Sequence, residues 1–483
     1  MRVVPGVASH LTYTDNAALA PSGDERARMV WDVSPSLRLS AESARASVTA
    51  QARLDYFFYS GAGAPAARRV ATLSANGSAE VLPDWIFAEA SAAVSQQPVS
   101  AFAQGPGAPA YSAANRAEVR SWRWSPYLAH RFGTALDLRL RYSHDEVSGD
   151  AHGFGRSRHD SVDVAAGGST GVRRVHWNAA GHRDFLTDGL LRTTSTERAS
   201  GGLRWNVIPV LSVSVNGGYD RYDFRTNGGA TRGTFRALGV GWQPSARTSV
   251  EASVGRRFFG RSDSLAIEHR SRSAVWNIGY SADVTTMRSQ FVLPATLDTA
   301  KLLDQLFRAM FPDPAERARA VADYIATSGL PPSLTDSVSY LSNRYILQRQ
   351  WQGAVALRGA RTQAVLALVQ AHRRALSAFE ADSRLLGTSL GRMHDETLQS
   401  SAQVFVHADI GNRTSWNVTL GHFRSESLSD GVSTASTVAR LGVARRFGRA
   451  IQGSVEARTT RGSLLGSAHY RENALTFGFQ AQF

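Results

Sequence analysis

Cysteine is absent from this 483-residue sequence, which excludes disulfide scaffolds and thiolate metal sites. Lysine is nearly absent too: Lys301 is the only one, so arginine supplies almost all of a formal net charge of +14. The arginines are spread evenly, without the basic run or stripe of a nucleic-acid surface, and we expect no nucleic-acid partner. The positive charge reflects either the codon usage of a GC-rich genome or an attraction for anionic lipopolysaccharide or acidic polysaccharide.

Long apolar runs are also missing. The longest, Ala364–Val369, is far shorter than the ~18–20 residues that a transmembrane helix needs. The mean hydropathy of −0.23 does not exclude a membrane β-barrel, because barrel strands show only every second residue to lipid. The opening MRVVPGVASH has no charged segment followed by an apolar one, so no signal peptide is visible. An exported protein needs one, and we therefore expect the natural start to be missing from this sequence.

What the sequence does contain is alternation of apolar and polar residues with a period of two. Successive side chains of a β-strand point to opposite faces, so this pattern predicts strands with one apolar and one polar face. The alternation recurs along nearly the whole chain, and clear examples are Leu136–Tyr142, Leu211–Tyr219, Thr248–Phe258 and Trp416–His422.

The connections between these segments alternate between short and long. Short turns are expected at Pro83-Asp84, Phe132-Gly133, Ile208-Pro209, Gln243-Pro244-Ser245 and Phe447-Gly448-Arg449. Longer, more polar connections are expected at Ala62–Arg68, Val99–Ala113, Ser148–Asp160, Arg225–Gly233 and Glu426–Thr434. Short periplasmic turns and longer outer loops are typical of outer-membrane barrels.

Aromatic residues gather near both ends of the expected strands. One set, near the short turns, comprises Trp85, Trp205, Trp242 and Trp416. The other, toward the long loops, comprises Phe57-Phe58-Tyr59, Tyr219, Tyr222, Phe224, Phe258-Phe259 and Phe423. Two aromatic girdles suit a barrel embedded in lipid. A soluble β-sandwich or β-helix, the alternative, has no reason to place aromatic residues at both strand ends.

The last segment, ENALTFGFQAQF, is the most specific one. Its apolar face is formed by Leu475, Phe477, Phe479, Ala481 and Phe483, and small or polar residues occupy the other face. An alternating last strand with a terminal aromatic residue resembles the signal that the outer-membrane barrel assembly machinery recognises. We therefore expect that machinery to be a partner of the C-terminal strand.

One region, Asp298–Ile325, breaks the strand pattern and indicates helix. Apolar residues recur there at helical spacing, namely Leu302, Leu303, Leu306, Phe307, Met310 and Phe311. A second helix is indicated by Asp313 as N-cap, Pro314 and Glu316 in its first turn, Gly329 at its exit and Pro331-Pro332 beyond. We predict a helical insertion over residues 296–332 that acts as a plug, a cap or a docking element, or is merely an ordered loop.

Together these patterns predict an all-β fold: one transmembrane antiparallel β-barrel over residues 1–483, with about 20–22 strands, in the outer membrane. The strand number is even in bacterial single-chain barrels. Either Val284–Leu293 is an additional strand, which gives 22, or one expected strand does not exist, which gives 20. The same ambiguity leaves open which side of the membrane holds the helical insertion.

The motif search nominates no catalytic, cofactor-binding or metal-binding residue and no cofactor, so we expect that the protein is not an enzyme. Gly167–Gly171 matches G-x-S-x-G, but a nucleophile elbow needs a following helix, and Val172–Trp177 has the pattern of a strand. The triplet His182-Arg183-Asp184 lacks every other kinase element. The 13 histidines are scattered without metal-ligand spacing.

Charged residues are expected on the faces that line the barrel. They include Arg53, Asp55, Asp137, Arg139, Arg141, Glu251 and Arg257. Mixed charges inside a barrel mostly pair with each other and hydrate the lumen, although a wide polar lumen could also conduct solutes.

Five segments, in order along the chain, resemble one known family. They are Pro5–Ser40, Val94–Phe102, Glu118–Gly133, Phe311–Ile325 and Leu341–Thr362. In sequence they begin PGVASHLTYTDN, VSQQPVSAF, EVRSWRWSPYLAHRFG, FPDPAERARAVADYI and LSNRYILQRQWQ. The chain is similar over nearly its whole length to the PEP-CTERM system-associated outer-membrane proteins of Gram-negative bacteria.

The resemblance implies a setting beside exosortase sorting systems and exopolysaccharide production, and it brings no catalytic residues. Two functions fit this setting. The barrel could be a pore or export channel for saccharide or sorted protein, with the helical insertion as a gate. Alternatively, it could be a closed structural or docking barrel that anchors surface polymer or an envelope protein. An outer-membrane enzyme lacks a site. Besides the assembly machinery, the expected partners are outer-membrane lipid and lipopolysaccharide.

Overall fold

The computed structural model describes residues 1–61, 63–105, 107–112, 115–188, 193–224, 231–291, 299–307, 317, 321, 340–378, 381–448, 450–465 and 468–483. Among these residues, none of the helices has the length and apolarity needed to cross a membrane.

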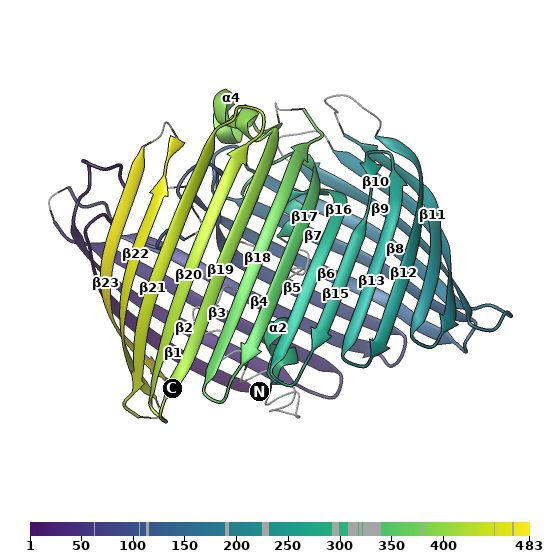
Figure 1. Ribbon diagram of the computed structural model, residues 1–483, viewed down its shortest axis with the longest axis horizontal. Helices are drawn as coiled ribbons and strands as arrows, with labels where there is room; N and C mark the ends of the chain where they lie inside the picture. The colour runs from purple at the N-terminus through teal and green to yellow at the C-terminus, as the bar shows by residue number, and fades with distance from the viewer. Residues whose placement is uncertain are drawn as a thin grey trace.

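Long antiparallel strands form almost the whole molecule (Figure 1). The strands are β1 (Arg2–Thr14), β2 (Arg28–Glu42), β3 (Ala46–Tyr59), β4 (Arg68–Leu82), β5 (Ile86–Pro98), β6 (Arg116–Phe132), β7 (Leu136–Gly149), β8 (Arg156–Ser169), β9 (Val175–Asp188), β10 (Thr194–Ile208), β11 (Leu211–Asp223), β12 (Arg232–Ser245), β13 (Thr248–Arg257), β14 (Gly260–Arg261), β15 (Ser264–Arg270), β16 (Ala274–Thr286), β17 (Tyr345–Arg358), β18 (Thr362–Ala375), β19 (Glu396–Ile410), β20 (Thr414–Ser427), β21 (Ser433–Arg446), β22 (Ile451–Ser463) and β23 (His469–Gln482). The described helices are α1 (Met287–Gln290), α2 (Thr299–Phe307) and α4 (Ser383–Met393).

The strands close into a single barrel. Each pairs with its neighbour along the chain, and β1 pairs with β23, where Gly6 faces Gln482 and Thr14 faces Ala474. The short β14 and the following β15 both pair with β13, so they are two pieces of one barrel strand. In the part of the chain that the structure describes, the barrel therefore has 22 strands, an even number.

The two ends of the barrel differ in their connections. Both termini and the short turns, such as 83–85 and 133–135, lie at one end, here called the short-turn end (Figure 1). The connections 15–27, 99–115, 287–344 and 376–395 leave the other end, here called the long-loop end.

The barrel exposes its apolar residues and encloses its polar ones. On β11, Val213, Val215 and Tyr219 point outward, and Val215 is 56% exposed, whereas Asp220 on the other face is fully buried. Large apolar side chains repeat this outward exposure around the barrel, with Trp31, Trp124, Trp205, Trp242, Trp276 and Trp351 among them. An apolar exterior can be stable only against lipid, and a closed antiparallel barrel leaves no backbone hydrogen-bonding group unpaired there.

The protein is an outer-membrane β-barrel. The predicted all-β, antiparallel transmembrane barrel is confirmed, and its strand number lies at the upper limit of the predicted range. Short turns mark the periplasmic side in such barrels, so the long-loop end faces outward.

A charge on the lipid-facing surface should destabilise the barrel, while the same charge one residue away should not. We expect Val215→Arg to lower the free energy of unfolding by about 2–4 kcal/mol, because an arginine near the bilayer midplane lies in hydrocarbon. The matched control is Ser214→Arg, whose side chain points into the lumen. Urea unfolding of both variants in lipid vesicles measures the difference. Equal destabilisation by the two substitutions would contradict the assignment of faces.

Two sequence-based expectations need correction. Val284–Leu293 does not form an additional strand: Val284 belongs to β16, α1 follows, and residues 292 and 293 lie outside the described part. The barrel nevertheless has 22 strands, so the sequence pattern predicted one strand too few outside this segment. The outer aromatic girdle is also incomplete, since Phe57, Tyr222, Phe224 and Phe423 are buried inside the barrel rather than exposed to lipid. Strand alternation explains this. In Phe57-Phe58-Tyr59, only the middle residue, Phe58, faces outward, and its two neighbours point into the barrel.

The G-x-S-x-G match proves to be a turn, as its neighbours indicate. Gly167 and Ser169 end β8, and β9 begins at Val175, so the segment joins two strands and no helix follows it. The short turns lie where the sequence predicts them, with two exceptions: Gln243-Pro244-Ser245 ends β12, so that turn falls at residues 246–247, and Arg449 lies outside the described residues.

The predicted helical insertion over 296–332 remains a prediction, because the described residues include only part of it. Within it the structure describes α2, Arg317 and Val321. The second expected helix, with Asp313, Pro314, Glu316, Gly329 and Pro331-Pro332, lies outside the described residues, as do Met310 and Phe311.

Candidate functional site

The connection 99–115, here called the inner loop, folds into the barrel at the long-loop end. It leaves β5 and returns to β6, yet its Tyr111 contacts β3 and β23, which lie two and five strands away from β5 around the wall. The Tyr59 hydroxyl of β3 donates to the Tyr111 carbonyl at 2.7 Å, and the Tyr111 hydroxyl donates to the Glu472 carboxylate of β23. The inner loop thus crosses from the β5–β6 side of the lumen to the β22–β23 side.

A buried ion pair holds the end of this crossing. Glu472 is fully buried and accepts from the Arg458 guanidinium of β22 at 2.8 Å and from the Thr14 hydroxyl of β1 at 2.9 Å. Arg458 also donates to the Tyr111 hydroxyl and lies over its ring. Burial raises the pKa of Tyr111, so this phenol stays protonated and remains a hydrogen-bond donor to Glu472.

A second buried cluster lies at the long-loop end around Asp382, next to α4. Its carboxylate accepts from the Ser342 hydroxyl at 2.7 Å and from the Asn343 backbone N–H at 2.6 Å. Arg344, only 1% exposed, donates to the Ser377 carbonyl and pairs with Asp395 at 2.5 Å. These contacts join the segment before β17 to the α4 segment, so two further connections are held together above the lumen.

His394 links the α4 segment to the inner loop. Its Nδ1 lies 2.7 Å from the Leu390 carbonyl and its Nε2 accepts from the Ala101 backbone N–H at 3.2 Å. The ring packs between Phe102 and Tyr340, with centroids 4.9 and 4.8 Å away. Because a carbonyl only accepts and a backbone N–H only donates, the imidazole must be neutral, with its proton on Nδ1.

Acidification should weaken this link. Burial, reinforced by Arg344 and opposed by Asp395, lowers the pKa of His394 to about 4, whereas an unfolded histidine titrates near 6.5. Above pH 6.5 the residue is neutral in both states. Between 6.5 and 4 only the unfolded state gains the proton, so folding stability should fall by about 3 kcal/mol and then level off. Thermal unfolding at pH 7 and pH 4.5 should show a larger shift in the wild type than in His394→Gln. Identical shifts would show that His394 does not titrate in this way.

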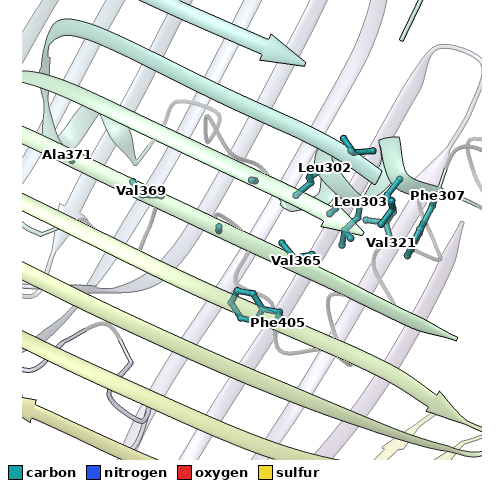
Figure 2. Packing of buried hydrophobic residues seen from close by; sticks show 13 residues of the cluster. Leu302, Leu303, Phe307, Val321, Val365, Val369, Ala371 and Phe405 are labelled. Atoms are coloured by element: carbon teal, nitrogen blue, oxygen red, sulfur yellow. The ribbon is translucent and has the colours of Figure 1, made fainter. Parts of the chain in front are cut away.

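At the other end of the lumen, α2 lies against an apolar patch of the inner wall (Figure 2). Leu302, Leu303, Leu306 and Phe307 are at most 5% exposed and form the helix face that contacts the wall. The wall contributes Val275, Ala354, Ala356, Val365, Ala367, Val369, Ala371 and Phe405, from β16 to β19. Val275 and Ala356 are near the short turn between β15 and β16 and that between β17 and β18, so α2 lies toward the short-turn end.

Between α2 and the long-loop end, the same strands carry carboxamides. Gln348, Gln350 and Gln352 of β17 hydrogen-bond in series, at 2.7 and 3.1 Å. The buried Arg373 of β18 donates to Gln348 at 2.9 Å and also to Gln399 of β19. This part of the wall is therefore lined mainly by carboxamides, with the buried Arg373 among them.

The lumen-facing charges predicted from the sequence are mostly paired. Arg53 binds Asp55 at 2.5 Å and Arg141 binds Glu89 at 2.7 Å. Arg257 donates to both Asp220 and Asp283. Asp137 and Glu251 share the inward faces of β7 and β13 with Arg141 and Arg257, as predicted, and the side chains of Asp137 and its partner Arg131 are more than half exposed. Arg139 lies over the ring of Tyr127.

The kinase-like triplet is divided between the two faces of β9. His182 and Asp184 face the lumen and hydrogen-bond each other at 2.8 Å, and His182 also binds Asp163 at 2.6 Å. Arg183 points outward toward Glu197. Within the described residues, no group of three or more His, Asp or Glu side chains is arranged to hold a metal ion. This histidine–carboxylate chain was not singled out from the sequence, because its members come from separate strands.

Comparison with solved structures supports the fold. The chain resembles large outer-membrane receptor barrels. The apoprotein form of the FrpB iron transporter from Neisseria meningitidis (F5-1 variant) matches with a TM-score of 0.50 and 9% identity, over 99% of this chain and 81% of that chain. The siderophore receptor PirA from Acinetobacter baumannii matches with a TM-score of 0.48 and 7% identity, over 100% of this chain and 80% of that chain. The siderophore receptor PirA from Pseudomonas aeruginosa matches with a TM-score of 0.45 and 9% identity, over 99% of this chain and 80% of that chain. At such identities the likeness concerns the fold alone. No family model and no curated protein matches the sequence.

Proposed function

We propose that this barrel is a gated outer-membrane channel in which the segment containing α2 is a displaceable plug. The observation that carries the proposal is the position of α2, inside the barrel and against an apolar patch of its inner wall. A barrel of this size encloses a lumen wide enough for polar solutes unless something fills it. Here α2 occupies the lumen toward one end, and the inner loop crosses it at the other.

The energetics of α2 suit a removable element. A helix of nine residues is not stable alone in water, so its order depends on packing. Its four buried apolar side chains each contribute about 1.5–3 kcal/mol of burial, from which the cost of ordering the segment must be subtracted. The remaining free energy is within the range that ligand binding or a partner protein can supply.

The family resemblance suggests what passes through. In an exosortase and exopolysaccharide setting the cargo would be a saccharide chain or a sorted protein, and lipopolysaccharide and the assembly machinery would be the barrel's membrane partners. The carboxamide wall of Gln348, Gln350 and Gln352 favours saccharide, because amides both donate to and accept from hydroxyl groups. The second candidate is a closed docking barrel that anchors surface polymer. It is favoured by the buried Glu472 and Asp382 clusters, which hold the inner loop and the α4 segment in place.

Ion conductance in planar bilayers distinguishes the two. Deleting residues 298–332 removes α2, and Leu303→Asp with Leu306→Asp places two charges against the apolar wall. Both changes should raise single-channel conductance severalfold above that of the wild type. The matched control is Gln305→Asp, which adds a charge to the same helix outside the buried face.

The gated channel and the closed docking barrel predict different conductances. High conductance in both altered proteins, with a wild-type value in the control, supports the gated channel. Absence of conductance in every form, although each protein is heat-modifiable on gels as a folded barrel is, would overturn it in favour of the closed docking barrel.

A further inference from the structure

Three lumenal arginines from distant parts of the chain meet beneath the inner loop. Arg68 begins β4, Arg116 begins β6 and Arg440 lies in the middle of β21. The Arg116 guanidinium donates to the Ala108 carbonyl at 2.7 Å, and that of Arg440 lies 3.5 Å from the Gly107 carbonyl. Since these two carbonyls are consecutive in the loop, the two guanidinium groups face the same short piece of backbone. The charges of Arg68 and Arg440 both act on Arg116.

The inner loop is pressed closely onto β21 at this point. A Cβ atom on Gly107 would lie 3.0 Å from the Val438 side chain, and one on Gly105 would lie 2.1 Å from the Ser436 hydroxyl. Val438 and Ser436 are on the same face of β21 as Arg440, two and four residues away. The contact of Arg440 with the loop is therefore part of a close packing arrangement that larger residues at these glycines would disrupt.

None of the three arginines has a carboxylate partner within ion-pair distance among the described residues. Arg68 reaches only the Gln96 carboxamide, at 3.5 Å, and the other two contact backbone carbonyls. The Arg68 Nη1 and Arg440 Nε groups are buried without a hydrogen-bond acceptor. Glu456 and Glu472 act on Arg440 only from a greater distance. Other lumenal arginines differ, since Arg458 is paired directly with a carboxylate.

This arrangement is suited to an anion. Like charges held close together repel, and a buried N–H without an acceptor costs free energy. Guanidinium groups bind carboxylate, phosphate and sulfate through paired, charge-assisted hydrogen bonds, so one oxyanion would satisfy both requirements. The carbonyls of Gly107 and Ala108 carry partial negative charge and satisfy the site only in part.

We infer that Arg68, Arg116 and Arg440 form an oxyanion-binding site of the lumen, for the acidic groups of a negatively charged saccharide chain. This inference rests on the proposed channel function and specifies its substrate class. It also gives the inner loop a role, because an arriving oxyanion competes with the loop carbonyls for Arg116 and Arg440. Binding of the chain would thereby weaken the attachment of the loop.

Equilibrium binding to the full-length barrel in detergent tests the site without requiring an open channel. The probe is a fluorescently labelled oligogalacturonate, with a neutral dextran oligomer of similar length as the comparison and inorganic phosphate as a competitor. Arg440→Gln and Arg116→Gln should each weaken oligogalacturonate binding by about tenfold, and Arg440→Lys should weaken it less, because it keeps the charge. Arg256→Gln, an exposed arginine on the outer face, should leave binding unchanged. Binding should also weaken as salt is raised.

Several results would overturn the inference. Equal affinity for dextran would show that charge is not recognised, and unchanged affinity in the lumenal variants would place the acidic ligand elsewhere. Complete displacement by phosphate at concentrations equal to those of galacturonate residues would assign the site to free oxyanions and refute the saccharide. Heat-modifiability on gels verifies that each variant is folded, and Arg440→Lys supplies a mild change should Arg440→Gln not fold. If oligogalacturonate does not bind, the oxyanion site is refuted, but the conductance result for the proposed channel still stands. A barrel that binds oligogalacturonate but conducts no ions would refute the channel function and leave the binding site.

Discussion

Glu472→Ala should lower the free energy of unfolding by about 3–5 kcal/mol and release the inner loop. Glu472 is fully buried and is the direct anionic partner of Arg458, whose side chain is only 8% exposed. Removing the carboxylate leaves that guanidinium buried without compensation and also removes the acceptor of the Tyr111 hydroxyl. The loss should therefore exceed the value of the hydrogen bonds themselves. Urea unfolding in lipid vesicles measures the stability, and limited proteolysis within 99–115 measures the release of the loop.

A double variant provides the control. Replacing both charges by apolar residues, Arg458→Met with Glu472→Leu, removes the ion pair without leaving a buried charge, so most of the stability should return. The inner loop should remain protease-sensitive, because Tyr111 still lacks its acceptor. If Glu472→Ala cost less than about 1 kcal/mol, as exposed ion pairs do, water would have to reach Arg458 and the described burial would be wrong.

Alternation alone was sufficient to predict the barrel wall. An outward residue must be apolar to meet lipid, and the strand geometry then places its neighbours inside, so each segment specifies its own two faces. The segments Leu211–Tyr219 and Thr248–Phe258 were recognised as strands for this reason. The exact strand number was not predictable, because the piece around Val284 has strand character but continues into α1.

The inner apolar patch escaped prediction although its signal is present in the sequence. Ala364–Val369, the longest apolar run, is too short for a membrane helix, and its length alone does not indicate what it packs against. It lies in β18, where Leu366 and Leu368 face lipid while Val365, Ala367 and Val369 face α2. A strand covered on both faces loses its alternation, as buried strands of parallel sheets do. An interruption of the alternation within a barrel strand therefore indicates something packed inside the barrel at that height.

The inner loop and the arginine cluster were not predictable from the sequence. Tyr111 and Glu472 are separated by 361 positions, and only the closure of the barrel brings β23 near β3 and the inner loop. Arg116 and Arg440 have no local pattern that distinguishes them from other arginines. Such sites depend on contacts across the lumen, for which sequence periodicity carries no information.

Deleting Phe483 should sharply reduce the amount of protein in the outer membrane, while the protein that does insert should unfold at nearly the wild-type temperature. Phe477 and Phe479 of the last strand face outward as the sequence predicted, and Phe483 follows at the short-turn end with 75% of its surface exposed. Its backbone N–H donates to the Pro5 carbonyl at 2.9 Å, beside the β1–β23 closure. Loss of this hydrogen bond and of one partly buried aromatic ring costs about 1–3 kcal/mol, which a barrel with so many ladder hydrogen bonds should tolerate.

The large effect is expected in assembly, because a terminal aromatic residue resembles the signal that the assembly machinery recognises. Phe447→Ala is the matched control: that ring is also exposed at the short-turn end, at 64%, but does not end the chain. Quantitative blotting of outer-membrane fractions should show a severe loss for the deletion and little loss for the control, and heating on gels should give similar unfolding temperatures for both. Normal insertion together with a much lower unfolding temperature would show instead that Phe483 stabilises the finished barrel and has no part in its recognition.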